Sequence, residues 1–475
     1  MKDLSGQSVV IVGAARQGTA LARYLLLHGG KVVLTDKLPL NELRVAQDSL
    51  VDLADAGYPL QWVCGGHPLS LLDGADLICL SGGVPLTMPL IAEARKRSIP
   101  LSNDSQIFLD ATPCKVVGIT GSAGKTTTTS LVGRMAQMAM DRAGKASPYH
   151  HIWVGGNIGS PLISMVDEMQ PEDLAVVELS SFQLEIMGRS PHLAAVLNLT
   201  PNHLDRHGNM VEYVAAKARI LDYQSHDDIA ILGRDDPGAW SLAGKVRGRM
   251  LTFGLSELPA ELMGALIRDG AIYLRTFEPP SLPGSDTYLM RRDDISLRGE
   301  HNLLNVMAAC TIASASGLPL EAIRDGVKGF TGVPHRLEFI RRWGGSDWYN
   351  DSIATAPERS MAAIKSFNEP LVLLAGGRDK NLPWDEFSAL VRQRVDHLIL
   401  FGEAANLILK AVNHSREDTF TVTRCESLSD AVGAAAQILQ PGDVVLLSPG
   451  CTSFDEFRDF EERGKCFTQW VKDLP

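Results

Sequence analysis

The strongest indication of chemistry in this 475-residue sequence is the segment 121–126, which reads Gly-Ser-Ala-Gly-Lys-Thr. An apolar, β-branched run precedes it and a helical pattern follows it. Glycines let backbone N–H groups surround phosphate oxygens, the helix N-terminus adds positive potential, Lys125 reaches the terminal phosphates, and Thr126 can bind Mg²⁺. Residue 119 is Ile where the full P-loop pattern has Gly. The segment predicts nucleotide binding; the alternative is a strand-to-helix turn with a surface lysine.

Two further polar groups follow apolar runs that are typical of buried strands. Glu178 ends the run 174–178, and His203 comes soon after the run 194–198. Ligands of open α/β sheets collect beyond the carboxyl ends of the strands. Glu178 would bind the Mg²⁺ that accompanies ATP, and His203 a second metal ion. A lone histidine is more often structural, and Lys217, on an expected helix, reads equally well as an exposed surface residue.

A weaker indication of nucleotide binding follows the first apolar run, 8–12. Residues 13–18 read Gly-Ala-Ala-Arg-Gln-Gly, which does not match G-x-G-x-x-G and so does not favour a redox dinucleotide. A tight turn that offers N–H groups to a diphosphate, with Asp36 near a ribose or base, is one interpretation. A plain Rossmann-like turn is the other.

Near the C-terminus, several turns close to expected strand ends carry charged residues. Arg336, Asp351, Arg378 and Lys380 all lie in such turns. The three cations are suited to phosphates or carboxylates. Each of them, taken singly, is as well explained as solvated surface.

These residues require parallel sheets to position them. Continuous apolar runs alternate with helical patterns in three regions, which predicts an α/β protein whose strands are covered by helices on both faces. We predict a Rossmann-like domain at 1–112, a P-loop-type central ATPase domain at 113–332 and a Rossmann-like C-terminal domain at 333–475. Short strands between 255 and 294 predict an antiparallel edge on the central sheet.

The composition narrows the class of protein. The formal net charge of -11 argues against nucleic acid as a partner, because a phosphate backbone needs a basic surface. Hydrophobic residues make up 45% and charged residues 21%, as in ordinary globular proteins. The seven cysteines have no paired spacing, and no apolar run approaches the length of a membrane span. We expect a cytoplasmic protein without membrane insertion, and a monomer.

Taken together, these motifs resemble the Mur ligases of peptidoglycan synthesis over nearly the whole chain. The resemblance rests on the segments 120–127, 155–159, 178–185, 203–206, 216–217, 301–305, 334–336, 350–352 and 447–460. Segments 180–183 and 453–460 are similar to those of the glutamate-adding members. The sequence departs from the family at Gly82-Gly83, where Pro-Gly is usual, at Ile353, where lysine is usual, and at Ala356-Pro357, where asparagine is usual.

The resemblance implies three small-molecule substrates: ATP, UDP-N-acetylmuramoyl-L-alanine and D-glutamate. It implies that ATP phosphorylates the terminal carboxylate and that the amine of glutamate attacks the acyl phosphate, with two Mg²⁺ ions in the site. By motif, it implies a phosphate-binding role for Gly121, Ser122, Ala123, Gly124, Lys125, Thr126 and Thr127; metal binding by Thr126, Glu178, His203 and a carbamylated Lys217; and further ATP contacts from Asn302, Arg336 and Asp351. It places Asp36, Lys37, Ser81, Asn157, Ser180 and Gln183 along the UDP-linked substrate, and Thr355, Lys380, Ser453 and Phe460 around glutamate.

Other readings stay open at this point. A sister ligase would add L-glutamate, alanine or a diamino acid, or act as a folylpolyglutamate synthetase. A nicotinamide-dependent oxidoreductase would explain the first domain, although the Gly-Lys-Thr segment counts against it. A non-catalytic nucleotide-binding module is a third class, against which the joint presence of Lys125, Glu178, His203 and Lys217 speaks.

Overall fold

The computed structural model describes residues 4–144, 147–157, 159–202, 204–276, 285–380, 382–412 and 420–475. The chain divides into two compact units, which are treated separately below. The N-terminal unit comprises Met1–Ser296 and Glu300–Phe330, and the C-terminal unit comprises Leu297–Gly299 and Thr331–Pro475. Within the described ranges, no helix is both long and apolar enough to cross a membrane.

The first sheet of the N-terminal unit is parallel throughout and has the strand order β3-β2-β1-β4-β5. Its strands are β1 (Ser8–Val12), β2 (Lys31–Asp36), β3 (Leu60–Cys64), β4 (Leu77–Leu80) and β5 (Leu101–Ser102). The helices of this region are α1 (Arg16–Leu27), α2 (Arg44–Asp48), α3 (Val51–Asp55), α4 (Pro89–Lys96) and α5 (Asp104–Ala111), with 3-10 turns η1 (Leu40–Glu42) and η2 (Leu69–Leu72). Val12 pairs with Thr35 on one side and Leu80 on the other, so Gly13, Asp36 and Ser81 follow at one edge of the sheet.

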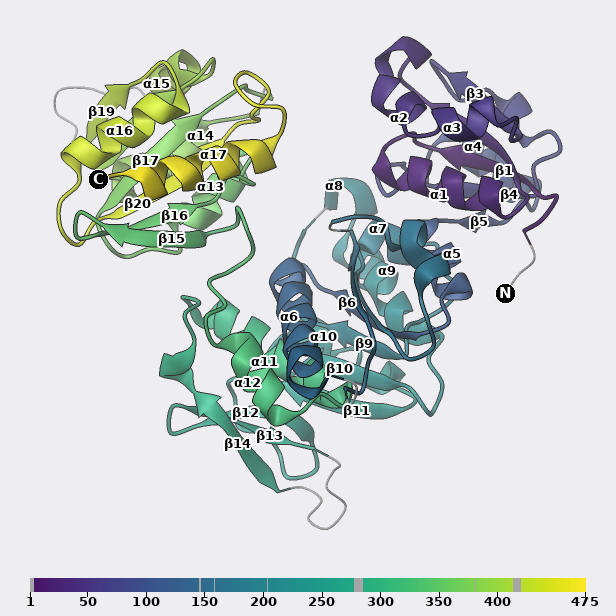
Figure 1. The fold of residues 1–475 in the computed structure, drawn as a ribbon, viewed down its shortest axis with the longest axis horizontal. Coiled ribbons are helices and arrows are strands. Elements are labelled where there is room, and N and C mark those ends of the chain that lie inside the picture. Colours follow the sequence, from purple (N-terminus) through teal and green to yellow (C-terminus); the bar gives the residue numbers. More distant parts are fainter. Residues whose placement is uncertain are drawn as a thin grey trace. The chain divides into compact units, whose positions relative to one another are not determined.

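The central sheet has the order β14-β13-β12-β11-β10-β9-β6-β8-β7. Figure 1 labels β6 and the strands from β9 to β14 of this sheet. Its strands are β6 (Lys115–Thr120), β7 (Ile152–Gly156), β8 (Leu174–Glu178), β9 (Leu193–Val196), β10 (Ile229–Gly233), β11 (Arg249–Phe253), β12 (Met263–Arg268), β13 (Ala271–Arg275) and β14 (Asp286–Arg291). β12, β13 and β14 pair antiparallel, which confirms the predicted antiparallel edge.

Helices of the same unit pack around this sheet. They are α6 (Lys125–Ala143), α7 (Ser181–Leu184), α8 (Leu204–His207), α9 (Met210–Asp222), α10 (Pro237–Trp240), α11 (Glu300–Ala315) and α12 (Leu320–Val327), with 3-10 turns η4 (Leu162–Glu168), η5 (Ala243–Lys245) and η6 (Arg292–Asp294). The helix α6 begins directly after the glycine-rich segment, as the sequence predicts.

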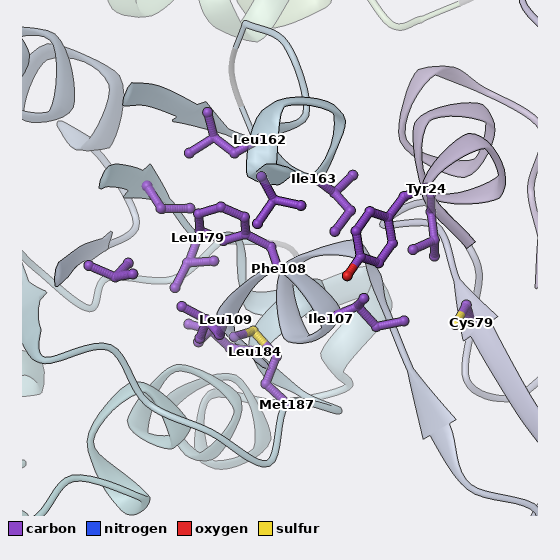
Figure 2. Packing of buried hydrophobic residues seen from close by; sticks show 14 of the residues in the cluster. Tyr24, Cys79, Ile107, Phe108, Leu109, Leu162, Ile163, Leu179, Leu184 and Met187 are labelled. Carbon is purple, nitrogen blue, oxygen red and sulfur yellow. The ribbon is translucent and has the colours of Figure 1, made fainter. Parts of the chain in front are cut away.

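One continuous core joins the first sheet to the central sheet. Ile107 and Phe108 of α5 are buried between Tyr24 of α1 on one side and Leu179 and Leu184 on the other (Figure 2). Burial of a large apolar side chain stabilises the fold by roughly 1.5–3 kcal/mol, so the buried side chains of α5 stabilise the packing of the first sheet against the central sheet. The predicted boundary at residue 112 falls just after this helix and stays a prediction.

The sheet of the C-terminal unit has the order β15-β16-β20-β17-β18-β19, in which only β15 is antiparallel to its neighbour among the described strands. Its strands are β15 (Glu338–Trp343), β16 (Ser346–Asn350), β17 (Leu371–Gly376), β18 (His397–Phe401), β19 (Thr421–Arg424) and β20 (Val444–Gly450). Its helices are α13 (Pro357–Ile364), α14 (Asp385–Arg394), α15 (Ala405–Val412), α16 (Leu428–Ile438) and α17 (Phe460–Asp473).

A buried arginine ties the loops at the carboxyl edge of this sheet together. Arg463 of α17 has 0% exposure and donates hydrogen bonds to the carbonyls of Ser352, Cys451 and Thr452 and to the Ser352 hydroxyl. Burial lowers the pKa of its guanidinium to about 10, opposed by the carboxylate of Asp455. The loops after β16 and β20 are therefore fixed to one side chain.

We predict that Arg463→Leu lowers the free energy of unfolding by about 3 kcal/mol or more, because each buried acceptor left without a donor costs about 1–3 kcal/mol. Urea unfolding of the variant measures this. Lys465→Ala, which removes an exposed cation from the same helix, serves as the matched control and should leave the midpoint unchanged. An unchanged midpoint in Arg463→Leu would show that the loops hold without this anchor.

Candidate active site

The glycine-rich loop between β6 and α6 has the conformation that phosphate binding requires. Gly124 has a φ of +83°, and a Cβ atom placed there would lie 2.1 Å from Oδ1 of Asn305. Only glycine fits this position, because other residues disfavour the left-handed region and would collide with the asparagine. The loop then delivers Lys125 as the first residue of a helix of 19 residues.

Two residues that the sequence did not single out hold this loop in place. Asn198, just beyond β9, accepts a hydrogen bond from the N–H of Ala123 at 2.8 Å and donates one to its carbonyl at 3.1 Å. The hydroxyl of Ser122 lies 2.9 Å from that of Tyr213. Asn198 is a polar residue at the end of an apolar run on the strand beside β6, and that pattern could have indicated it.

A cavity of about 220 Å³ adjoins the loop. Its lining includes Ala123, Gly124, Asn198, Asp235, His301 and Asn305. Asn302, predicted to contact ATP, lies beside this wall and accepts a hydrogen bond from Asn305 at 3.2 Å. The mixed polar and apolar lining suits part of a nucleotide. A larger cavity, about 890 Å³, lies at the amino ends of β1, β4 and β5 and includes none of the predicted site residues.

Glu178 lies beneath the loop with its carboxylate almost fully enclosed. It is 2% exposed and accepts hydrogen bonds from the Thr126 hydroxyl at 2.8 Å and from the Asn157 amide at 3.0 Å. Two adjacent ligands of an octahedral ion with bonds of about 2.1 Å are separated by about 3 Å. The hydroxyl and carboxylate oxygens therefore have both the chemistry and the spacing of Mg²⁺ ligands.

Lys217 is buried beside these groups, contrary to the interpretation of an exposed helical lysine. It is 2% exposed, and its amine donates to the Thr120 hydroxyl at 3.2 Å. Burial, reinforced by the nearby charge of Lys125, holds the pKa of this amine well below its usual value, while Glu178 opposes the shift. No carboxylate forms an ion pair with it within the described part of the chain.

His203, the remaining predicted metal ligand, lies outside the described residues. Within the ranges that are described, no three His, Cys, Asp or Glu side chains gather closely enough to hold a metal ion. Thr126 and a carbamylated Lys217, which the resemblance implies as metal ligands, are not among these four residue types.

The residues predicted to lie along the UDP-linked substrate fall into two groups. Asp36 and Ser81 meet at the carboxyl edge of the first sheet, where Asp36 accepts from the N–H of Ala14 at 2.8 Å and Ser81 donates to the Gly13 carbonyl at 2.9 Å. Lys37 is exposed beside them. The side chains of Asp36 and Ser81 thus shape the tight turn after β1.

The second group adjoins the central sheet. Ser180 and Gln183 form a reciprocal capping box at the start of α7, and the Gln183 amide donates to the Ser105 hydroxyl at 2.8 Å. Gln183 is 1% exposed. The structure therefore gives Gln183 a positioning function, and its predicted contact with substrate stays a prediction.

In the C-terminal unit, Asp351 follows β16 in a fully enclosed position. Its carboxylate accepts from the Ser448 hydroxyl at 2.8 Å and from the N–H of Leu337 at 3.2 Å. Burial raises its pKa to about 7, against the opposing effect of Ser448. Arg336 lies between His335 and Leu337, whose φ values of +64° and +44° are strained for residues other than glycine.

The residues predicted to bind glutamate surround one edge of the same sheet. The amine of Lys380, after β17, donates to the Thr355 hydroxyl at 3.2 Å. Ser453 is buried in the loop after β20, and Phe460 begins α17, where its carbonyl accepts from the Ser352 hydroxyl at 2.8 Å. Arg378 has a different role, because both arms of its guanidinium contact Glu403 at 2.9 Å.

Comparison with known proteins decides the family. A family model described as the Mur ligase middle domain matches residues 119–313, and one described as the Mur ligase, glutamate ligase domain matches residues 335–451. The chain is 40% identical over 468 residues to the UDP-N-acetylmuramoylalanine--D-glutamate ligase of Symbiobacterium thermophilum, covering 98% of each chain. It is 38% identical over 476 residues to the ligase of the same name from Pelotomaculum thermopropionicum, covering 100% of this chain and 99% of the relative.

The chain belongs to the Mur ligase family. It is therefore a ligase, as predicted, and neither an oxidoreductase nor a non-catalytic module. Its fold is similar to the crystal structure of the UDP-N-acetylmuramate-alanine ligase MurC from Thermotoga maritima, with a TM-score of 0.54 and 17% identity over 98% of this chain and 99% of that one. It is equally similar to MurF from Acinetobacter baumannii, with a TM-score of 0.54 and 18% identity over 98% and 92%. The prediction of an α/β Mur ligase fold with parallel sheets is confirmed.

In this Mur ligase, Gly124→Ala should weaken ATP binding by about 1–2 kcal/mol or more, which corresponds to about 5- to 30-fold. The added methyl group demands a left-handed backbone and displaces Asn305 from the cavity wall. Titration calorimetry with a non-hydrolysable ATP analogue measures the change. Gly244→Ala, whose Cβ would have nothing within 4 Å, is the matched control and should bind as the wild type does.

Proposed function

We propose that this chain joins D-glutamate to UDP-N-acetylmuramoyl-L-alanine and converts ATP to ADP and phosphate in the process. The observation that carries the proposal is its full-length similarity to relatives named for that reaction. A phosphate-binding loop directly above the buried Glu178 supports it. Because ATP and the nucleotide-linked substrate are cytoplasmic solutes, the proposal places the reaction in the cytoplasm.

The reaction needs activation because a free carboxylate is a poor electrophile. The alanyl carboxylate attacks the γ-phosphorus of ATP, the bond to the β-phosphate oxygen breaks, and ADP leaves. The neutral amine of D-glutamate then attacks the acyl phosphate, loses a proton and forms a tetrahedral intermediate. Collapse of this intermediate expels phosphate and leaves an amide bond. The protein contributes positioning and charge stabilisation.

Residues of the N-terminal unit would handle the phosphates. The backbone of 121–124, with Lys125 and Thr127, would surround the β- and γ-phosphates. Thr126 and Glu178 would hold a Mg²⁺ ion, whose charge would offset that of the transferring phosphoryl group. The cavity beside Asn302 and Asn305 would take the nucleoside end of ATP.

Lys217 would serve a second Mg²⁺ ion together with His203, as a carbamate. A protonated amine at this buried position, close to Lys125, would repel a cation, and no carboxylate of the described residues forms an ion pair with it. A neutral amine is the form that reacts with carbon dioxide. Its nitrogen forms a bond to the carbon of carbon dioxide and releases a proton, and the single negative charge of the resulting carbamate is shared by two oxygens, which are suitable Mg²⁺ ligands.

The remaining assignments follow the edges of the sheets. Asp36, Lys37 and Ser81 would meet the UDP portion, while Asn157, Ser180 and Gln183 would line the muramoyl portion. Arg336 and Asp351 of the C-terminal unit would contact ATP. Thr355, Lys380, Ser453 and Phe460 would enclose D-glutamate.

Purified protein should release phosphate from ATP only when UDP-N-acetylmuramoyl-L-alanine and D-glutamate are both present. A panel of D- and L-amino acids, assayed for ADP release, tests this requirement and the choice of amino acid together. Preference for L-glutamate, alanine or a diamino acid would replace the proposed substrate. Steady turnover with ATP and amino acid alone would contradict the acyl phosphate route.

Lys217→Ala should nearly abolish turnover, and a short carboxylic acid should restore part of it by occupying the space of the carbamate. Lys217→Arg keeps a cation but cannot form a carbamate, so it should be equally inactive. Lys115→Ala, which removes an exposed lysine of the same unit, is the control. In ¹³C NMR with labelled bicarbonate, wild-type protein should show a carbamate resonance that both Lys217 variants lack; its absence from wild type would overturn the assignment.

A further inference from the structure

A second cation, which the sequence alone does not indicate, lies beside the residues predicted to bind glutamate. Arg359 is in the first turn of α13, and its guanidinium donates to the carbonyl of Ile353 at 3.4 Å. The same carbonyl accepts from the N–H of Thr355 at 2.8 Å, and the Thr355 hydroxyl accepts from the Lys380 amine. Arg359 and Lys380 therefore converge on one tight turn, 353–355.

The two side chains have like charges, although the positive charge of Arg359 also acts on the buried carboxyl of Asp351, where it opposes the rise in pKa that burial causes. Burial lowers the pKa of Lys380, and the positive charges of Arg359 and Arg463 lower it further. Throughout the described chain, neither Arg359 nor Lys380 forms an ion pair with a carboxylate. Arg378, close to Lys380 in sequence, has the opposite arrangement, because Glu403 neutralises it. Arg359 and Lys380 thus differ from Arg378 in having no ion-pair partner among the described residues.

Helix stability does not explain the position of Arg359. A cation in the first turn of a helix faces the positive end of the helix dipole, which is unfavourable by a few tenths of a kcal/mol to about 1 kcal/mol. An arginine that is also close to a lysine adds repulsion to this cost. An exposed arginine with a purely structural function would more favourably lie elsewhere. Two cations that converge on one turn are suited to bind an anion.

We propose that Arg359 binds a carboxylate of the incoming D-glutamate together with Lys380, an inference that rests on the proposed function. Position 353, where the family resemblance implies lysine, holds a neutral isoleucine in this chain. Arg359 reaches back over that residue and supplies the missing positive charge from the following helix. The turn 353–355 thereby presents two cations to a dicarboxylic amino acid.

Steady-state kinetics of full-length Arg359→Ala test this assignment. The KM for D-glutamate should rise about 10- to 100-fold, because a charged hydrogen bond contributes on the order of one to two powers of ten in affinity. The KM values for ATP and for UDP-N-acetylmuramoyl-L-alanine should stay at their wild-type values. Arg359→Lys, which keeps the charge, should retain most of the affinity for D-glutamate. Arg424→Ala, an exposed arginine on the edge strand β19, is the matched control and should change none of these constants.

Two results would overturn the inference. One is a wild-type KM for D-glutamate in Arg359→Ala; the other is a rise confined to the KM for ATP, which would make Arg359 a phosphate ligand. The wild-type protein separates these outcomes from failure of the proposed function. If wild type does not use D-glutamate at all, the proposed reaction fails; if it does and Arg359→Ala matches it, the assignment of Arg359 alone fails.

Discussion

The burial of the Glu178 carboxylate beneath the glycine-rich loop is the constraint on which the arrangement of the central sheet's edge depends. A carboxylate removed from water requires hydrogen bonds, and Thr126 and Asn157 supply them. The register of the central sheet makes this possible, because Glu178 pairs with Ile119 on one neighbouring strand and Gly156 on the other. A carboxylate facing the phosphates of ATP would be repelled unless cations lay between them. The buried charge therefore supports the proposed divalent ion at this site.

All three sheets use the same geometric rule to gather their site residues. Parallel strands end at a common edge, and polar residues placed just beyond that edge converge although they are far apart in sequence. Gly13, Asp36 and Ser81 meet in this way at the first sheet. Thr126 and Glu178 do so at the central sheet, and Asp351 and Ser448 at the third. The rule fixes where a ligand binds, while the chemistry depends on the residues that occupy the edge.

The sequence predicted what local patterns determine. The bounds of the strands 8–12 and 174–178 agree with the structure, because strands buried on both faces are uninterrupted apolar runs. The glycine-rich loop could also be predicted from the sequence. Contacts between residues far apart in the sequence could not be predicted. Asn198 holds Ala123 across 75 residues, and Glu403 neutralises Arg378 across 25. Lys217 was also ambiguous, because its burial depends on the packing of α9 against the central sheet and not on its neighbours in sequence.

The charges of the C-terminal unit illustrate how a fold concentrates positive potential at one place. Arg463 has its hydrogen-bonding capacity used by loop carbonyls and a hydroxyl, none of which cancels its charge, so its field extends to Lys380. Asp455 offsets part of that field, yet burial weakens the screening by water. Lys380 lies in the loop that follows β17, and Arg359 lies in the first turn of α13. Holding like charges together lowers stability, whereas an amino acid with two carboxylates relieves the repulsion on binding and a neutral one does not. On the proposed assignment, discrimination between them would depend on the electrostatics of these cations more than on the shape of a pocket.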